Sequence, residues 1–149
     1  MRVLAVLLLL IGWFFASGAV VPAAADETPS SLPQGERDAI HGVIEGQIGA
    51  FRSGDDGTAF GFAAPGIQMQ FGDAGHFVEM VRRTYAPVYH PRSVTFGALV
   101  EIDGQPVQKV RVVGPDGATA LALYFMEQEP DGSWRIGGCM LTQDDSIGA

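Results

Sequence analysis

The stretch ATALALYFMEQEPDGSWRIGGCMLTQ, residues 118–143, contains two segments of alternating apolar side chains separated by Pro130-Asp131-Gly132. Proline, aspartate and glycine together supply the backbone angles of a tight reversal, so the stretch predicts a β-hairpin. Alternation and turn signals of the same kind extend back to Ser93 and predict an antiparallel meander of four strands. The strands are expected at 93–102, 106–113, 118–129 and 133–143.

The third predicted strand, 118–129, is apolar on both faces, which indicates a central position in the sheet. Its two faces are Leu121, Leu123 and Phe125, and Ala120, Ala122, Tyr124 and Met126. Helices can cover only one face, so the other needs a second cover. We expect the face with Tyr124 to form a homodimer with a second copy of the chain.

The residues before the sheet have the period of helices. A first helix is expected at 36–53, because its apolar residues recur on one face: Ile40, Val43, Ile44, Ile48 and Phe51. Gln47 falls inside this face, either as a core amide bonded to backbone or as a polar group lining a pocket. Shorter helices are expected at 58–64, ended by Pro65 and Gly66, and at 74–86.

Three glycines, Gly42, Gly46 and Gly49, share the opposite face of the first predicted helix. Glycine weakens a helix by about 1 kcal/mol relative to alanine. Either another part of the chain approaches closely at this face, or the helix is weak.

Aspartates precede the second and third predicted helices, Asp55-Asp56 before one and Asp73 before the other. Adjacent carboxylates can hold a metal ion or act as an acid/base pair. Carboxylates at a helix N-terminus also accept hydrogen bonds from its free N–H groups. We favour the capping role.

The connector Pro87-Val88-Tyr89-His90-Pro91-Arg92 concentrates aromatic, imidazole and guanidinium groups between the helices and the sheet. Because proline restricts the residue before it, we expect this connector to be extended. The candidate ligand-binding residues are Gln47, Tyr85, Tyr89, His90 and Arg92. A planar guanidinium suits a carboxylate ligand. Alternatively, the prolines and tyrosines only fix the crossing and Arg92 pairs with a carboxylate of the chain.

Cys139 is the only cysteine, so it cannot form an intrachain disulfide. Three roles are open for it: a small buried residue on a strand, a catalytic nucleophile, or an intermolecular disulfide. We favour the first, because free cysteine is among the most buried residue types.

The first 25 residues have the pattern of an export signal. Met1-Arg2 is basic, the run from Val3 to Phe15 is apolar, and Ala23-Ala24-Ala25 satisfies the small-residue rule for cleavage. We expect cleavage after Ala25 and a periplasmic or extracellular protein with no stable membrane span. An uncleaved N-terminal anchor is the alternative, since the apolar run is long enough for a bilayer. A linker is then expected at 26–35, a single domain at 36–143 and a tail at 144–149.

Charge and motifs exclude several classes of function. The 9 basic and 17 acidic residues give a formal net charge of -8, the opposite of a nucleic-acid-binding protein. GxGxxG, Walker, HExxH, CxxC and GxSxG motifs are all missing, which removes support for nucleotide, zinc and serine-hydrolase chemistry. His41, His76 and His90 lack the spacing of metal ligands. We therefore expect neither a metal nor a cofactor.

Four segments carry a resemblance to a known family: VIEGQIGAF, MVRRTYAPVYHPRSVTFG, VVGPDGATALALYFME and DGSWRIGGCML. Over residues 36–143 the chain resembles a bacterial family catalogued as domain of unknown function 4864. More broadly it resembles the cystatin-like α+β cone of the nuclear transport factor two superfamily. The resemblance implies an α+β fold in which three helices pack on a curved four-stranded sheet and enclose an apolar cavity. Gly97, Gly137 and Gly138 are the positions where the strands are expected to bend.

Two hypotheses for the function follow. The first, which we favour, is a noncatalytic exported module that binds a small apolar or carboxylate ligand, or a protein, through the cavity or a sheet face. The second is a cofactor-free acid/base enzyme of the isomerase, dehydratase or hydrolase type, using Tyr85, Tyr89 and His90. A buried acid or base of shifted pKa in the cavity would favour the enzyme, and an apolar cavity would favour the binding module.

Overall fold

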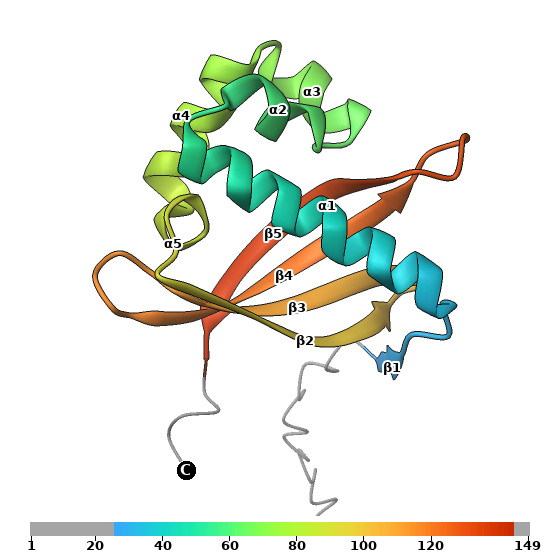
Figure 1. Ribbon diagram of the computed structural model, residues 1–149. Coiled ribbons are helices and arrows are strands. Elements are labelled where there is room, and N and C mark those ends of the chain that lie inside the picture. The colour runs from blue at the N-terminus through green and yellow to red at the C-terminus, as the bar shows by residue number, and fades with distance from the viewer. Residues whose placement is uncertain (1–25, 145–149) are drawn as a thin grey trace, which may run out of the picture.

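The computed structural model describes residues 26–144, so the expected export signal at 1–25 lies outside the described residues. The chain forms one antiparallel sheet with strand order β1-β2-β3-β4-β5, and the helices lie on one face of it (Figure 1). The strands are β1 (Glu27–Pro29), β2 (Ser93–Ile102), β3 (Gln105–Val113), β4 (Thr119–Gln128) and β5 (Trp134–Gln143). The helices are α1 (Gln34–Ser53), α2 (Asp56–Gly61), α3 (Pro65–Phe71), α4 (Ala74–Thr84) and α5 (Ala86–Tyr89). Within 26–144, no helix is both long and apolar enough to cross a membrane.

The α+β class and the four-stranded meander are confirmed, with strand bounds within one residue of those expected. The turn between β2 and β3 shows why the prediction succeeded. Asp103 and Gly104 have φ values of 52° and 77°, the positive pair that a two-residue hairpin turn requires. The strand count was wrong, because β1 lies in the stretch expected to be a linker. It pairs antiparallel with the end of β2, from Glu27 opposite Ile102 to Pro29 opposite Val100.

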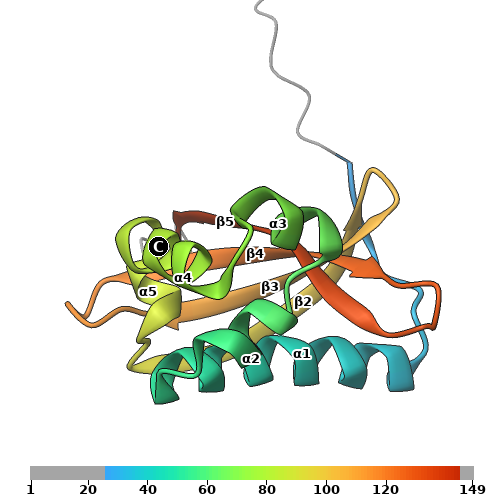
Figure 2. The same cartoon turned by 90° about the horizontal axis from the view of Figure 1, so that it is seen from above.

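The prediction of three helices was also wrong, and proline accounts for the difference. We expected Pro65 to end a helix and Pro87 to open an extended connector, but each stands in the first turn of a new helix, α3 and α5. A proline in the first turn loses no hydrogen bond, because the first N–H groups of a helix have no partner within it. Both short helices pack beside α4, with α3 over β5 and α5 against β3 (Figure 2).

Two glycines mark irregularities in the sheet, as expected. Gly97 lies where the pairing of β2 with β3 shifts, between Phe96 and Leu99. Gly137 is the extra residue where β5 pairs with β4, because Phe125 pairs with Gly138 and Met126 pairs with Ile136. Bulges of this kind bend a strand and increase its twist. The second one lies beside the cavity described below.

The face of β4 that we assigned to a homodimer packs inside the molecule. Ala122 and Tyr124 are 0% exposed and Met126 is 1% exposed, and Ala120 packs against the same core. The surface assignment was therefore wrong, because the helices cover this face and not the face of Leu121. Alternation could not choose between the faces, since both are apolar. Dimerisation itself stays a prediction.

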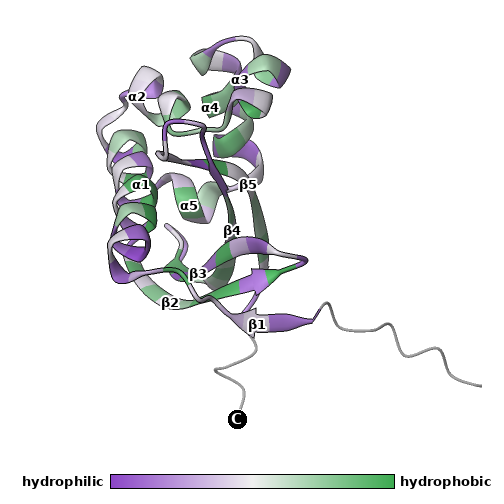
Figure 3. Cartoon of the chain, turned by 90° about the vertical axis from the view of Figure 1, so that its right-hand side faces the viewer, coloured by the Kyte–Doolittle hydropathy of each residue, from purple (hydrophilic) through white to green (hydrophobic). Residues whose placement is uncertain are grey.

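The core lies between the helix layer and the sheet. The buried face of α1 includes Ile40, Ile44, Ile48 and Phe51, as its periodicity predicted. Apolar segments of α1, α5 and β4, seen in the side view of Figure 3, contribute buried residues to this core.

One glycine of α1 permits a close contact. A Cβ atom at Gly46 would lie 2.6 Å from the ring of Phe62, the residue that caps α2. Apart from the backbone of α1 and the adjacent residues, no atom of the described chain lies within 4 Å of the corresponding positions at Gly42 and Gly49. We considered a close approach by another part of the chain or a weak helix. The close approach explains Gly46 but not Gly42 or Gly49.

The hairpin end of β4 and β5 is tied to the start of α1. Trp134 is 5% exposed, and its indole Nε1–H donates to a carboxylate oxygen of Glu36. Gln128 Nε2 donates to the same oxygen at 3.4 Å. The polar tip of this buried aromatic side chain is therefore satisfied.

Candidate functional site

A cavity of about 300 Å³ lies between the sheet and helices α3, α4 and α5. Its size is at the lower end of the range for small-molecule sites. Because liquid water occupies about 30 Å³ per molecule, the cavity has room for roughly ten non-hydrogen atoms.

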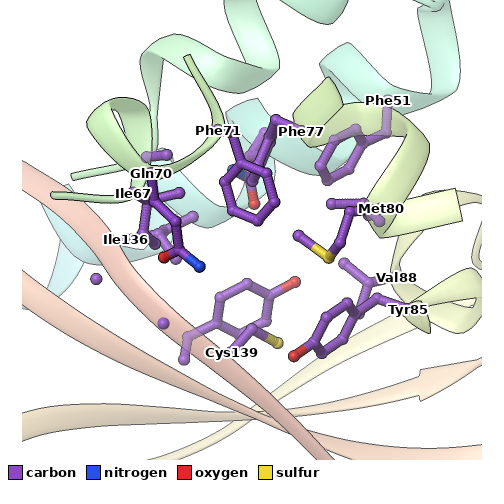
Figure 4. Close-up of a pocket in the computed structure, with 16 residues that line it drawn as sticks. Phe51, Ile67, Gln70, Phe71, Phe77, Met80, Tyr85, Val88, Ile136 and Cys139 are labelled. Atoms are coloured by element: carbon purple, nitrogen blue, oxygen red, sulfur yellow. The ribbon is translucent and has the colours of Figure 1, made fainter. Parts of the chain in front are cut away.

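The walls of the cavity are mainly apolar and come from elements that are far apart in the sequence (Figure 4). The helices and the segments between them contribute Gln47, Phe51, Ala63, Ile67, Gln70, Phe71, Phe77, Met80, Val81, Tyr85 and Val88. The strands contribute Tyr124, Ile136, Gly137, Gly138 and Cys139. Over residues 26–144, no aspartate, glutamate, histidine, lysine or arginine belongs to this lining.

The cavity has a buried interior and a more exposed rim. Phe51, Phe77, Tyr124 and Ile136 are each at most 6% exposed. Gln70 of α3, by contrast, is exposed, and its amide points into the cavity (Figure 4). The exposed and half-buried lining residues of α3 and α4 place the open side of the cavity next to these helices.

Tyr124 contributes the most unusual polar group of the cavity. Its side chain is 0% exposed, and its hydroxyl has no hydrogen-bond partner among residues 26–144. A buried hydroxyl without a partner costs about 1 to 3 kcal/mol of stability. Burial, and secondarily the Cys139 sulfur, raise the pKa of Tyr124 well above its usual range, so the hydroxyl keeps its proton at neutral pH.

Cys139 lies directly across from Tyr124, on the neighbouring strand β5. It is half-buried, and burial raises the pKa of its thiol to about 12. The hydroxyl of Tyr85 points toward this sulfur in Figure 4, and burial together with Cys139 raises the pKa of Tyr85 as well. At neutral pH these three side chains are uncharged.

Gln47 and Tyr85 are the two predicted ligand-binding residues that the structure brings to the cavity. Gln47 is 4% exposed, and its Nε2 donates to the carbonyl oxygen of Ala59 at 3.1 Å. Its amide therefore bonds to backbone and also lines the cavity, so the two roles considered for it are compatible. Tyr85 is half-buried between α4 and α5.

The other three predicted residues, Tyr89, His90 and Arg92, do not line the cavity. The ring of Tyr89 lies 5.6 Å from the ring of Phe51, behind the cavity wall, and the guanidinium of Arg82 lies 5.8 Å from the Tyr89 ring. His90 is exposed and stacks edge-on against Tyr89 at 4.4 Å. Arg92 is exposed beside the turn at Gly117.

Sequence reasoning missed Tyr124 and Gln70 as cavity residues. Tyr124 was assigned to a surface because its strand is apolar on both faces. The sequence did contain one indication that Tyr124 lines a cavity, namely a hydroxyl among apolar residues on one face of a strand. The same kind of pattern identified Gln47. Gln70 carried no signal, because α3 itself was not predicted.

The aspartates before α2 and α4 cap those helices, as expected. Asp55 accepts hydrogen bonds from the backbone N–H of Thr58 at 3.1 Å and from its hydroxyl at 2.7 Å, which lower the pKa of Asp55. Asp73 accepts from the backbone N–H of His76 at 2.9 Å, which lowers the pKa of Asp73. In the described range 26–144, no three metal-ligating side chains lie close enough to hold an ion.

Comparison with known proteins gives a family and nothing further. Neither the curated proteins nor the solved structures include a significant match to this chain. A family model described as a domain of unknown function, DUF4864, matches residues 34–149, which include every helix and all strands except β1. The chain therefore belongs to the DUF4864 family.

Proposed function

We propose that the protein is a noncatalytic binding module that takes a small, mainly apolar molecule into the cavity between the sheet and helices α3 to α5. The observation that carries this proposal is an apolar cavity of about 300 Å³ lined by Tyr124, whose buried hydroxyl has no partner among the described residues. Polar groups placed in an apolar concavity are the usual pattern of a small-molecule site.

The chemistry of the lining favours binding over proton transfer. A general base at neutral pH needs a pKa near 7, and among the described residues no carboxylate or imidazole lines the cavity. Burial raises the pKa of Tyr124 and Cys139, so both stay protonated at neutral pH and cannot accept a proton, and the thiol is not a thiolate nucleophile. Tyr89 and His90, two of the groups considered for an enzyme, lie outside the cavity.

Export and the cone fold belong to the same proposal. The pattern of residues 1–25 supports secretion with cleavage after Ala25. The bulged sheet under an open cavity is in keeping with a resemblance to the cystatin-like cone. An intact mass or N-terminal sequence of protein recovered from the periplasm tests export, and a mass that retains residues 1–25 would contradict cleavage.

Blocking the cavity tests the binding function. Isopropylbenzene has nine carbon atoms and fits the expected size, so it should raise the melting temperature of the wild type, as any ligand of the folded state does. Ile67→Trp places a larger ring in the lining and should abolish this rise. The matched control is Met69→Trp on the same helix, because Met69 is 80% exposed and does not line the cavity.

Two results would overturn the proposal. One is a wild type that isopropylbenzene does not stabilise at concentrations near its solubility. The other is an equal loss of stabilisation in Ile67→Trp and Met69→Trp, which would place the ligand elsewhere.

A further inference from the structure

The ligand class can be narrowed further, on the assumption that the cavity binds a ligand. We propose that the ligand is an uncharged, mainly apolar molecule with one acceptor oxygen, and that this oxygen accepts a hydrogen bond from the Tyr124 hydroxyl.

The first step concerns the hydroxyl itself. Tyr124 lines the cavity, its hydroxyl is buried, and no described residue accepts its proton. Nearly all buried side-chain polar groups in folded proteins have a partner, and an exception calls for an explanation. The donor is also permanent, because the pKa of Tyr124 is raised and the hydroxyl stays protonated across the physiological range. An acceptor on the ligand is therefore the complementary group.

The second step concerns charge. The described lining has no basic side chain, and the whole chain has a net charge of -8. A carboxylate placed here would lose its hydration without gaining a cation, which is strongly unfavourable. Arg92, the residue expected to bind a carboxylate, is exposed and lies outside the cavity. An uncharged acceptor, such as a ketone, ester or ether oxygen, avoids this cost.

The third step concerns size and shape. Room for roughly ten non-hydrogen atoms, between the rings of Phe51, Phe71 and Phe77, suits a compact ring or a short chain. Acetophenone, isopropylbenzene and benzoate each have nine non-hydrogen atoms and nearly the same shape. They differ in the acceptor that they offer: acetophenone has a neutral carbonyl oxygen, isopropylbenzene has no acceptor, and benzoate has a charged carboxylate.

The test compares the affinities of these three probes for the wild type and for Tyr124→Phe, which keeps the ring and removes the hydroxyl. We expect acetophenone to bind Tyr124→Phe about tenfold more weakly than wild type, the effect of one lost hydrogen bond to a buried donor. Isopropylbenzene should bind both proteins equally. Tyr89→Phe, at a tyrosine outside the cavity, is the matched control and should change neither affinity. Benzoate should bind the wild type at least about a hundredfold more weakly than acetophenone.

A second readout does not depend on the variant. The infrared carbonyl stretch of bound acetophenone should move to lower frequency in the wild type than in an apolar solvent, because a hydrogen bond weakens the carbonyl bond. The stretch should return to its apolar-solvent value in Tyr124→Phe. If that variant does not fold, the wild-type shift alone decides.

The outcomes separate this inference from the binding function. If none of the probes binds the wild type, the proposed function fails and the inference fails with it. If isopropylbenzene and acetophenone bind but Tyr124→Phe weakens neither, or the carbonyl stretch does not shift, the cavity binds ligands and the inference alone is overturned. If benzoate bound as tightly as acetophenone, the inference that the ligand is uncharged would be overturned.

Discussion

Two buried aromatic side chains, Trp134 and Tyr124, lie on the same face of the sheet. Each ends in a polar group, but the two groups differ in their hydrogen bonding. Trp134, at the hairpin end of β4 and β5, donates its indole N–H to Glu36 of α1. Tyr124, in the middle of β4, lines the cavity and has a buried hydroxyl whose proton no described residue accepts. The two side chains are 5% and 0% exposed, so solvent does not explain the difference.

The difference separates a structural region from a candidate functional one. At the hairpin end, α1 covers the strands and the polar atoms are paired, as expected of a core that only has to be stable. Beneath α3, α4 and α5 the packing leaves a cavity of about 300 Å³ and a hydroxyl donor that is unpaired within residues 26–144. Both features lower stability in the absence of a ligand, which is the pattern expected of a site that a ligand completes.

The largest effect is expected at the hairpin end. Trp134→Phe removes the bond to Glu36 and part of a large buried ring, so the free energy of unfolding should fall by about 3 kcal/mol. Chemical denaturation measures this fall. Glu36→Gln is the control, since it keeps an acceptor for the indole, and it should lose less. A loss below about 1 kcal/mol in Trp134→Phe would remove the contrast between the two regions.

The cavity region should be the more sensitive to alkaline pH. The folded protein holds the pKa of Cys139 at about 12, above the value of about 8.5 for an unfolded thiol. The stability that comes from the protonated thiol is therefore fully present below pH 8.5 and is lost as the pH rises toward 12. Between pH 8 and pH 11, the wild type should lose about 3 kcal/mol more than Cys139→Ala. Parallel pH profiles of the two proteins would show that the thiol is freely solvated.

Two glycines of α1 test whether the helix packs closely against Phe62. Gly46→Ala places a methyl group against the ring of Phe62 and should lower the free energy of unfolding by about 1 to 2 kcal/mol. Gly49→Ala meets no described atom within 4 Å and should raise it by up to about 1 kcal/mol, because alanine favours the helix. Denaturant midpoints of the two variants measure the difference, and equal shifts would contradict the close approach at Gly46.

The smallest effect is expected at Tyr124, and it has the opposite sign to that at Trp134. Tyr124→Phe removes a buried hydroxyl that no residue in the described part of the chain pairs with. Without ligand the variant should therefore be more stable than wild type by about 1 kcal/mol. Thermal and chemical denaturation both measure this gain. A loss of stability would show that the hydroxyl has a partner in the folded protein.

The sequence predicted the sheet more completely than the helix layer. Local turn chemistry sets the hairpins, and Asp103-Gly104 and Pro130-Asp131-Gly132 gave strand ends within one residue. The helices α3 and α5 were missed because a proline that ends one helix and a proline that begins the next look the same along the sequence. The strand β1 was missed because three residues are too few for alternation to be visible.

The candidate site was predictable only in part, for a related reason. Gln47 and Tyr85 were found because each is a polar group at a position that periodicity or a chain crossing marks as unusual. Which face of β4 turns inward depends on the packing of distant helices, and its own alternation does not contain that information. Tyr124 therefore could not be assigned to the cavity, and Arg92 could not be excluded from it.

A crystal structure of the protein with acetophenone tests the central claim most directly. The account predicts the ring in the cavity among Phe51, Phe71 and Phe77, with the carbonyl oxygen within hydrogen-bond distance of the Tyr124 hydroxyl. A cavity filled by the protein's own side chains would contradict the account. So would acetophenone bound with its oxygen turned away from Tyr124.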